Sequence, residues 1–406
     1  MSATLARLLP LYVVVFIGFL GYSLTVTVFT PLIMQAEGGM IAKGTSTGTR
    51  TIILGILLSL YPFGQFVSAP ILGSLSDRYG RRPVLLTSLV LAAAVYVMLA
   101  MALETHNLAL LMVACLLGGL CEGNVTISQS AIADVTAAEE RGRYFGYVYF
   151  TISFAFVVGP LFGGNLADAS LVSWFSNATP FWVVCGLLTV TMVWAIFRLG
   201  ETRTAQPADR IRLFDAFTNL FNVVTDRRLR MLYLINLCIY LAIFGFFRSY
   251  PLYLVDAFDL DVTQLAMFIA WVSVPVMAIN LFAIAWLMRR FSIKRMVFWS
   301  AILLAVSMIA VLVPSSQSGL WFPLFFAGLF LAICLPACTS VLSFAVGEDE
   351  QGQVLGNNQS LQVGSESLSG LVVGFLAAVF IPLPMIVLAV IAVTGAGLLK
   401  LYERRS

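Results

Sequence analysis

The chain has 406 residues, of which 60% are hydrophobic and only 11% are charged. Soluble globular domains carry about 25% charged residues, so this composition excludes an ordinary soluble protein. The formal net charge is only +3, because 20 acidic residues nearly balance the 23 Lys and Arg residues. The positions of the basic residues along the chain are therefore more informative than the net charge.

Twelve stretches of mostly apolar residues follow one another along the chain. A bilayer core of about 30 Å needs about 20 residues of helix, so each stretch predicts a transmembrane span. The first is too long for a signal peptide and lacks a small-residue cleavage site, so we expect it to remain as a span. The predicted spans are residues 9–35, 51–72, 83–103, 108–134, 143–166, 179–199, 231–255, 263–288, 296–314, 320–346, 354–380 and 383–402. The predicted fold class is an all-α membrane protein.

Basic residues are concentrated on one side of these spans. If the N-terminus is cytoplasmic, all Lys and Arg residues except Lys43, Arg50 and Arg248 fall in segments on the inner side. This satisfies the positive-inside rule and predicts an integral multi-pass protein with both termini in the cytoplasm. The basic residues are thus accounted for by topology, and we expect a lipid bilayer and no nucleic acid as partner.

The longest charged stretch divides the chain into two halves. We expect a six-helix bundle in residues 1–199, a cytoplasmic linker in 200–230 and a second six-helix bundle in 231–406. Within the linker, apolar residues recur at spacings of three and four and predict an amphipathic helix on the cytoplasmic face. The segment 133–146 also resembles 344–356, which indicates an internal repeat.

Residues with the chemistry of an enzyme or a metal site are scarce. All six cysteines fall in predicted spans, where Cys334 and Cys338 are better explained as small buried hydrophobes than as ligands of a soft metal. The segment GTSTG at 44–48 fits the serine-hydrolase pattern, but a short loop between spans cannot supply the strand, turn and helix that it needs. With His106 as the single histidine, we expect no metal site and no enzyme.

The segment GSLSDRYGRRPVL, residues 73–85, lies between the second and third spans. It resembles motif A of the major facilitator superfamily, and the span count and linker agree with that family. The resemblance implies two pseudo-symmetric six-helix bundles and a gate on the cytoplasmic side, in which Asp77 and Arg81 hold the halves together in the outward-open state. From the residues alone, Gly73 and Gly80 permit a tight turn, and Asp77 attracts a helix N-terminus or an arginine. The residues that match the motif are Gly73, Leu75, Asp77, Arg78, Gly80 and Arg81.

A second motif lies on the fifth span. The segment AFVVGPLFGG, residues 155–164, is similar to a pattern in the family's drug/proton antiporters, with Gly159, Pro160, Gly163 and Gly164 at the matching places. Together with the preceding segment 132–146 it most resembles the tetracycline/proton antiporter branch, which implies a bacterial inner (plasma) membrane. The alternative is that small residues merely allow close helix packing and that Pro160 kinks the helix.

Two carboxyl groups stand out among the 20 acidic residues. Only Glu122 and Glu366 fall near the predicted mid-depth of the bilayer. An ionisable group there costs about 2.5–3.5 kcal/mol to insert and usually marks a pathway or a partner. Because desolvation disfavours the charged form, such a group is suited to carry a proton, and we predict Glu122 first and Glu366 second as proton-coupling residues.

Other roles for these carboxyl groups stay open. Each could be a protonated group that joins two helices by a hydrogen bond. Many antiporters of the family carry an arginine on the fourth span, four residues before a glycine, but Ala114 and Cys115 occupy those places here. Glu122 could therefore bind a cationic substrate instead of a proton.

Polar residues on several spans could line a substrate cavity. On an ideal helix Thr126 and Gln129 share a face with Glu122, and Gln362 shares one with Glu366. Arg248, the only basic residue inside a span, could extend to the membrane interface, bind an anionic substrate or pair with a carboxylate. The candidate cavity residues are Asn124, Thr126, Gln129, Asn236, Tyr240, Arg248 and Gln362.

These observations lead to one function and one alternative. We expect a secondary active transporter that works by alternating access and exports a small organic compound, a drug or metabolite, in exchange for protons. The alternative is a proton-coupled uptake symporter, or a facilitator, of a small polar metabolite. We expect a monomer with no cofactor, apart from protons as the coupling ion.

Overall fold

The structure is a computed structural model, and it describes residues 3–35, 40–122, 124–136, 138–202, 215–226 and 228–405. Twelve helices in this part of the chain are long and apolar enough to cross a membrane, one for each predicted span. The prediction of an all-α membrane protein with twelve transmembrane helices is confirmed.

The first six spans are formed by α1 (Ala3–Met34), α2 (Thr47–Tyr79), α3 (Arg81–Glu104), α4 (Leu108–Cys121) with α5 (Asn124–Val135), α6 (Ala138–Ala167) and α7 (Thr179–Arg198). The linker contains α8 (Asp215–Thr225). The last six spans are formed by α9 (Arg230–Phe258), α10 (Val262–Ala278) with a π-helical turn (Ile279–Ala283) and α11 (Ile284–Arg290), α12 (Ile293–Ala310), α13 (Gln317–Ser343), α14 (Glu348–Val379) and α15 (Leu383–Arg405).

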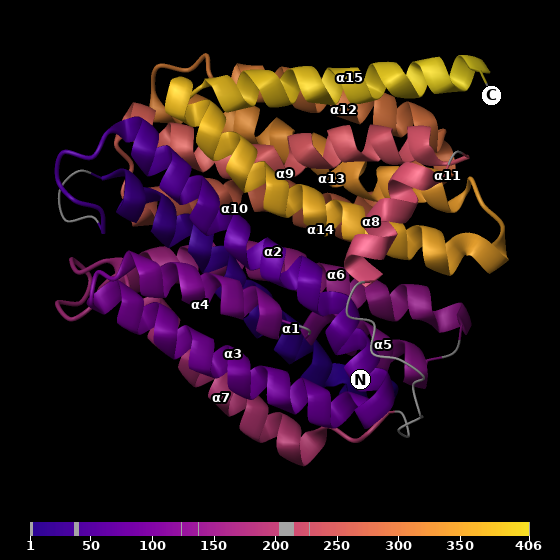
Figure 1. Cartoon of the computed structure of the whole chain (residues 1–406), viewed down its shortest axis with the longest axis horizontal. Coiled ribbons are helices and arrows are strands. Elements are labelled where there is room, and N and C mark those ends of the chain that lie inside the picture. Colours follow the sequence, from indigo (N-terminus) through magenta and orange to yellow (C-terminus); the bar gives the residue numbers. More distant parts are fainter. Residues whose placement is uncertain are drawn as a thin grey trace.

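The helices form two bundles that lie side by side (Figure 1). We call them the N-half, α1 to α7, and the C-half, α9 to α15. Within the N-half α1 packs on α6, α2 on α4 and α3 on α7; within the C-half α12 packs on α13 and α15, and α9 on α15. Apolar side chains fill the contacts between these helices.

The two ends of the molecule differ in which segments they carry. The linker end bears the α2–α3 turn, α8 and the C-terminus, and the distal end bears the α1–α2, α3–α4 and α9–α10 loops (Figure 1). At the distal end Ser46, Asn107 and Asp261 cap the N-termini of α2, α4 and α10 by accepting a backbone hydrogen bond. These caps set where the spans begin.

The halves touch most closely at the distal end, where α2 packs against α14. A Cβ atom built on Gly55 would lie 2.7 Å from the Cα of Gly374, so only glycine allows the two backbones to approach this closely. Two turns before Gly55 on α2, a Cβ atom on Gly48 would lie 3.6 Å from the Cβ of Ala378 on α14. The distal end is therefore closed along the α2–α14 contact.

A second contact between the halves joins α6 to α10. The Thr263 hydroxyl donates a hydrogen bond to the Gly164 carbonyl at 3.1 Å, and a Cβ atom on Gly164 would lie 2.8 Å from the Cβ of Ala266. Thr263 is near the start of α10, and Gly164 is near the end of α6, so this contact also belongs to the distal end.

Towards the linker end the helices of the two halves spread apart, and α8 lies where they diverge (Figure 1). The Phe217 ring of α8 meets Phe66 of α2 edge to face, with centroids 5.3 Å apart. The Asn219 amide of α8 donates to the Ser360 hydroxyl of α14 at 3.3 Å. The linker helix thus bridges the two halves at the end where they are apart.

Three spans differ from the sequence predictions in ways with a physical cause. The fourth span is not one helix, because the chain leaves helical geometry at Glu122. The eighth contains the π-helical turn, which follows Pro275 by four residues. The ninth ends at Ala310 instead of residue 314, because Pro314 cannot continue the helix.

Candidate functional site

Glu122 lies at the interruption of the fourth span. Its backbone angles are φ −86° and ψ 65°, between the end of α4 at Cys121 and the start of α5 at Asn124. The side chain is only 5% exposed. The face predicted for Glu122, Thr126 and Gln129 assumes a continuous helix, and the chain does not keep helical geometry at Glu122, so the shared face stays a prediction.

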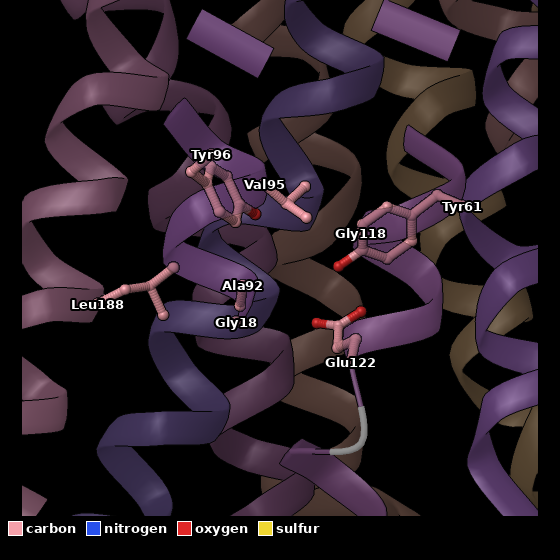
Figure 2. Close-up of a pocket in the computed structure, with 8 residues that line it drawn as sticks. All are labelled: Gly18, Tyr61, Ala92, Val95, Tyr96, Gly118, Glu122 and Leu188. Carbon is pink, nitrogen blue, oxygen red and sulfur yellow. The ribbon is translucent and has the colours of Figure 1, made fainter. Parts of the chain in front are cut away.

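The Glu122 carboxyl group points into a small pocket inside the N-half (Figure 2). The Tyr61 hydroxyl of α2 donates a hydrogen bond to it. The remaining lining is almost wholly apolar and comes from α1, α3, α4 and α7, with the Tyr96 hydroxyl of α3 as the other polar group (Figure 2). The residues that line the pocket are Gly18, Tyr61, Ala92, Val95, Tyr96, Gly118, Glu122 and Leu188.

Glu122 has little to balance a negative charge. In the part of the chain that the structure describes, it forms no ion pair, and Tyr61 is its side-chain hydrogen-bond donor. A charge buried in apolar surroundings is costly unless it is paired and hydrogen-bonded. The site therefore favours a proton or a cationic group on Glu122.

Glu366 of α14 has a different environment, because it meets Arg248 of α9. The Arg248 Nη2 atom lies 3.3 Å from Glu366 Oε1, and the two side chains are 5% and 17% exposed. Arg248 also donates from Nη2 to the Tyr22 hydroxyl of α1 at 2.7 Å, and that hydroxyl donates to Glu366 Oε1 at 2.5 Å. Of the roles considered for Arg248, pairing with a carboxylate is the one formed here, and extension to the membrane interface is excluded by its burial.

Aromatic stacking joins these two groups of residues. The Tyr22 ring stacks on the Tyr61 ring, with centroids 4.8 Å apart and planes 27° from parallel. Tyr61 holds Glu122, and Tyr22 holds Glu366 and Arg248. A chain of contacts therefore runs from Glu122 in the N-half to the ion pair in the C-half. We call these five residues the central network.

The other candidate cavity residues lie in several places. Thr126 and Gln129 are half-buried on α5, and Gln362 is half-buried on α14, one turn before Glu366. The side chain of Asn124 lies outside the described residues.

Asn236 and Tyr240 lie together inside the C-half. Asn236 donates to the Asn358 side chain at 3.1 Å, and Tyr240 accepts from Asn358 at 2.9 Å. Tyr240 also lies 3.3 Å from the Thr339 hydroxyl. In this structure both side chains join α9 to α13 and α14, and their role in a cavity stays a prediction.

The segment that resembles motif A forms the end of α2, a turn and the start of α3. Gly80 is the turn residue, with φ +96°, and a Cβ atom there would also lie 2.6 Å from a Glu201 carboxylate oxygen. Glu201 accepts from the backbone N–H of Arg81 at 2.9 Å and of Arg82 at 3.1 Å, and so caps α3. Gly73 lies inside α2 and makes no turn, and the exposed Arg78 rests over the Tyr79 ring.

Arg81 is the buried centre of this segment. Its guanidinium group pairs with Asp77 at 2.8 Å and with Asp134 of α5 at 2.9 Å, and it donates to the Ser76 hydroxyl at 2.6 Å. All of these partners belong to the N-half. Arg81 therefore does not join the halves in this conformation, and the gate across the halves stays a prediction for the state in which the linker end is closed.

Replacing Asp134 by asparagine is expected to destabilise the protein more than replacing Asp77. The Asp134 side chain is 19% exposed and the Asp77 side chain 42%, so water replaces the Arg81 bond less well at Asp134. A hydrogen bond to a charged group contributes about 1.5–3 kcal/mol. Thermal unfolding of purified Asp134→Asn and Asp77→Asn in detergent checks this order, and an equal or reversed loss of stability would contradict it.

The glycines of the fifth-span motif pack helices together. Cβ atoms on Gly159 and Gly163 would meet Ser23 and Leu24 of α1, and one on Gly164 would meet α10 across the halves. Pro160 lies inside α6. The close packing that we considered as the alternative reading is present, and the motif's link to antiport stays a prediction.

Four residues of the central network and of the motif A segment were not predicted from the sequence. Tyr22 and Tyr61 complete the central network, Asp134 pairs with Arg81, and Glu201 caps α3. For Asp134 and Glu201 the sequence offers a signal, since both are acidic residues beside the arginines of the linker end. Tyr22 and Tyr61 offer no comparable signal, because tyrosine is common in apolar helices.

The chain matches a protein family and several known proteins in sequence. A family model described as Major Facilitator Superfamily matches residues 11–363, and again residues 232–406. The Tetracycline resistance protein, class H, of Pasteurella multocida is 37% identical over 139 residues, which cover 34% of this chain and 34% of that protein. The alignment thus spans about a third of that relative's length.

Two further matches extend over nearly the whole chain. The Quinolone resistance protein NorA of Staphylococcus aureus (strain MSSA476) is 22% identical over 402 residues, covering 98% of this chain and 97% of NorA. A crystal structure of a bacterial homolog to the human lysosomal transporter Spinster, inward-facing and unoccupied, has a TM-score of 0.77 at 15% identity, with 100% and 98% of the chains covered. At that identity the likeness shows the fold alone.

Proposed function

The chain belongs to the Major Facilitator Superfamily, and from that premise we propose that it exports a small organic compound in exchange for protons. Membership makes the chain a transporter and not an enzyme. The proposal concerns the direction, the coupling ion and the class of substrate. Transport proceeds by alternating access, with the distal end and the linker end opening in turn.

The observation that carries the proposal is the setting of Glu122. Glu122 is 5% exposed, and its carboxyl group accepts from Tyr61 and has no ion-pair partner among the described residues. A proton neutralises such a group, and so does the cationic group of a substrate. Because both cannot occupy it at once, their competition exchanges one for the other across the membrane.

Glu366 is proposed as a fixed charge more than as a proton carrier. Arg248 and the Tyr22 hydroxyl both contact it, so its negative charge is balanced within the network. The sequence ranks Glu122 first and Glu366 second for proton coupling, and this difference in their surroundings supports the order.

The membrane topology indicates which end of the molecule faces the cytoplasm. The excess of Lys and Arg on the linker side of the spans supports a cytoplasmic linker end. The closed α2–α14 contact at the distal end then belongs to the conformation that receives substrate from the cytoplasm. We place the protein in the inner (plasma) membrane of a bacterium, as a monomer with both termini in the cytoplasm and no cofactor.

The names of the relatives guide the choice of substrate. Tetracycline and quinolone resistance proteins share sequence with this chain. We therefore propose a small, mainly apolar organic compound with a protonated amine, the group that Glu122 would meet.

Purified protein in liposomes tests direction and coupling together. Tetracycline and a quinolone serve as probes, with an acidic interior, a neutral exterior and a pH-sensitive dye inside. An exchanger accumulates the probe inside while the internal pH rises, because protons leave as the probe enters. Accumulation only with an acidic exterior would identify a symporter, and equilibration without pH change a facilitator; either would overturn the proposal. Empty liposomes correct for passive entry.

A further inference from the structure

Tyr22 is a buried residue of the N-half that contacts charged residues of the C-half. It belongs to α1 of the N-half, and its hydroxyl contacts Arg248 of α9 and Glu366 of α14 in the C-half. Its ring stacks on Tyr61 and meets Phe156 of α6 edge to face. One side chain thus holds contacts to both halves.

The bonding of the Tyr22 hydroxyl depends on the charge of its neighbours. A phenol has one proton to donate, and here it donates to Glu366 Oε1 while accepting from Arg248 Nη2. This arrangement needs Glu366 Oε1 as an acceptor and Arg248 as a cation. The Arg248 Nε atom is buried without a hydrogen-bond partner in the described structure, so loss of Tyr22 would leave the guanidinium group still less satisfied.

The ring of Tyr22 connects this contact to Glu122. Stacking fixes the plane of Tyr61, and Tyr61 in turn supplies the hydrogen bond to the Glu122 carboxyl group. The charged and titratable groups that face this stack are Glu122, Arg248 and Glu366, with the Tyr96 hydroxyl beside Glu122. The stack therefore connects the surroundings of the two carboxyl groups.

We infer that Tyr22 is a positioning residue that couples the occupancy of Glu122 to the movement of the two halves. Opening the distal end moves α1 away from α9 and α14, which breaks both hydroxyl bonds of Tyr22 and releases the ring of Tyr61. Glu122 then loses its donor and binds a proton or substrate with a different affinity. This inference rests on the proposed exchange of protons for substrate at Glu122.

The first test compares two transport measurements in Tyr22→Phe, which keeps the ring and removes the hydroxyl. Accumulation of tetracycline driven by an acidic interior is expected to fall about tenfold or more, the effect of losing a hydrogen bond to a charged group. Exchange of labelled for unlabelled tetracycline without a pH gradient is expected to persist within a few-fold of wild type, because binding needs no hydroxyl at Tyr22. Tyr12→Phe removes another buried hydroxyl from α1, one that bonds the Tyr144 carbonyl, and is expected to behave as wild type.

A second measurement tests Tyr22 without any substrate or gradient. In a variant with Gly48→Cys and Ala378→Cys, the rate of disulfide formation under mild oxidation reports how often the distal end is closed. Adding Tyr22→Phe is expected to slow this reaction several-fold, and adding Tyr12→Phe is expected to leave it unchanged. An unchanged rate with Tyr22→Phe, or a parallel loss of accumulation and exchange, would overturn the inference. Absence of proton-driven accumulation in the wild type would instead refute the proposed function, and the cross-linking rate would still decide the role of Tyr22 in closure.

Discussion

Replacing Glu122 by glutamine is expected to reduce proton-driven accumulation of substrate to the level of empty liposomes. Glutamine preserves the shape of the side chain and can still accept a hydrogen bond from Tyr61, but it cannot take up or release a proton. Exchange of substrate between the two sides of the membrane needs no proton turnover and is expected to continue, although at higher substrate concentrations, because glutamine cannot pair with the protonated amine of the substrate. The measurement records accumulation under a pH gradient and exchange without one, in the same preparation.

Two control variants make the Glu122 result specific. Glu104→Gln changes an exposed carboxylate that accepts from the Trp182 indole at the distal end, and it is expected to transport as wild type. Glu366→Gln weakens the contact with Arg248 and Tyr22, so it is expected to slow transport while leaving the remaining flux proton-linked. Unchanged proton coupling in Glu122→Gln would rule out Glu122 as the proton site. Loss of accumulation and exchange together, at every substrate concentration, would instead show that substrate binding depends mainly on the Glu122 charge.

A disulfide between positions 48 and 378 is expected to stop transport completely and reversibly. The Cβ atom of residue 48 would lie 3.6 Å from that of residue 378, within the range of about 3.5–4.5 Å found in disulfides. A bond there ties α2 to α14 at the distal end, and alternating access requires those helices to separate. Oxidation of Gly48→Cys, Ala378→Cys is expected to abolish flux, and a reducing agent is expected to restore it.

The control for this prediction uses each single cysteine variant under the same oxidation. Of the six native thiols, Cys115, Cys334 and Cys338 are buried, but Cys121, Cys185 and Cys238 are half-buried, so the oxidised wild type serves as a further control. Formation of the bond is checked by cleavage at an engineered protease site in the linker, after which the halves separate on a gel only when reduced. Full transport by the cross-linked protein would contradict alternating access through the α2–α14 contact.

The membrane spans could be predicted from the sequence because each must be an apolar helix long enough to cross the bilayer. Apolar stretches of the required length occur twelve times, and each forms a helical span in the structure, although the fourth span is broken at Glu122. The break at Glu122 is less visible, since hydropathy does not distinguish a continuous helix from two short ones. Gly123 and Asn124 beside it are the only local hints, and neither residue excludes a helix.

The carboxyl groups of the central network were predictable, and their connections were not. Glu122 and Glu366 stand out because charge at mid-depth is costly. Arg248 lies toward the end of a predicted span, where a long side chain ordinarily reaches the interface, yet it turns inward because Glu366 and Tyr22 offer a buried counter-charge and an acceptor. Tyr22 and Glu366 are 344 residues apart in the chain, so their contact depends on how the two halves assemble.

In motif A, at the linker end, the important residues could likewise be predicted from the sequence, but not all of their contacts. The sequence correctly places a turn at Gly80, where a positive φ is required. It also singles out Asp77 and Arg81, but Asp134 of α5 binds Arg81 as well. The role of a charged residue in such a motif is set by helices that arrive from elsewhere in the chain.

Proton release on substrate binding tests the central claim most directly. Tetracycline is added to purified protein in detergent and weak buffer, and the change in pH is compared with the amount of tetracycline bound. If proton and substrate compete for Glu122, the wild type releases up to about one proton for each molecule bound, whereas Glu122→Gln binds without release. Binding to the wild type without release at any pH, or equal release by Glu122→Gln, would contradict the proposed exchange at Glu122.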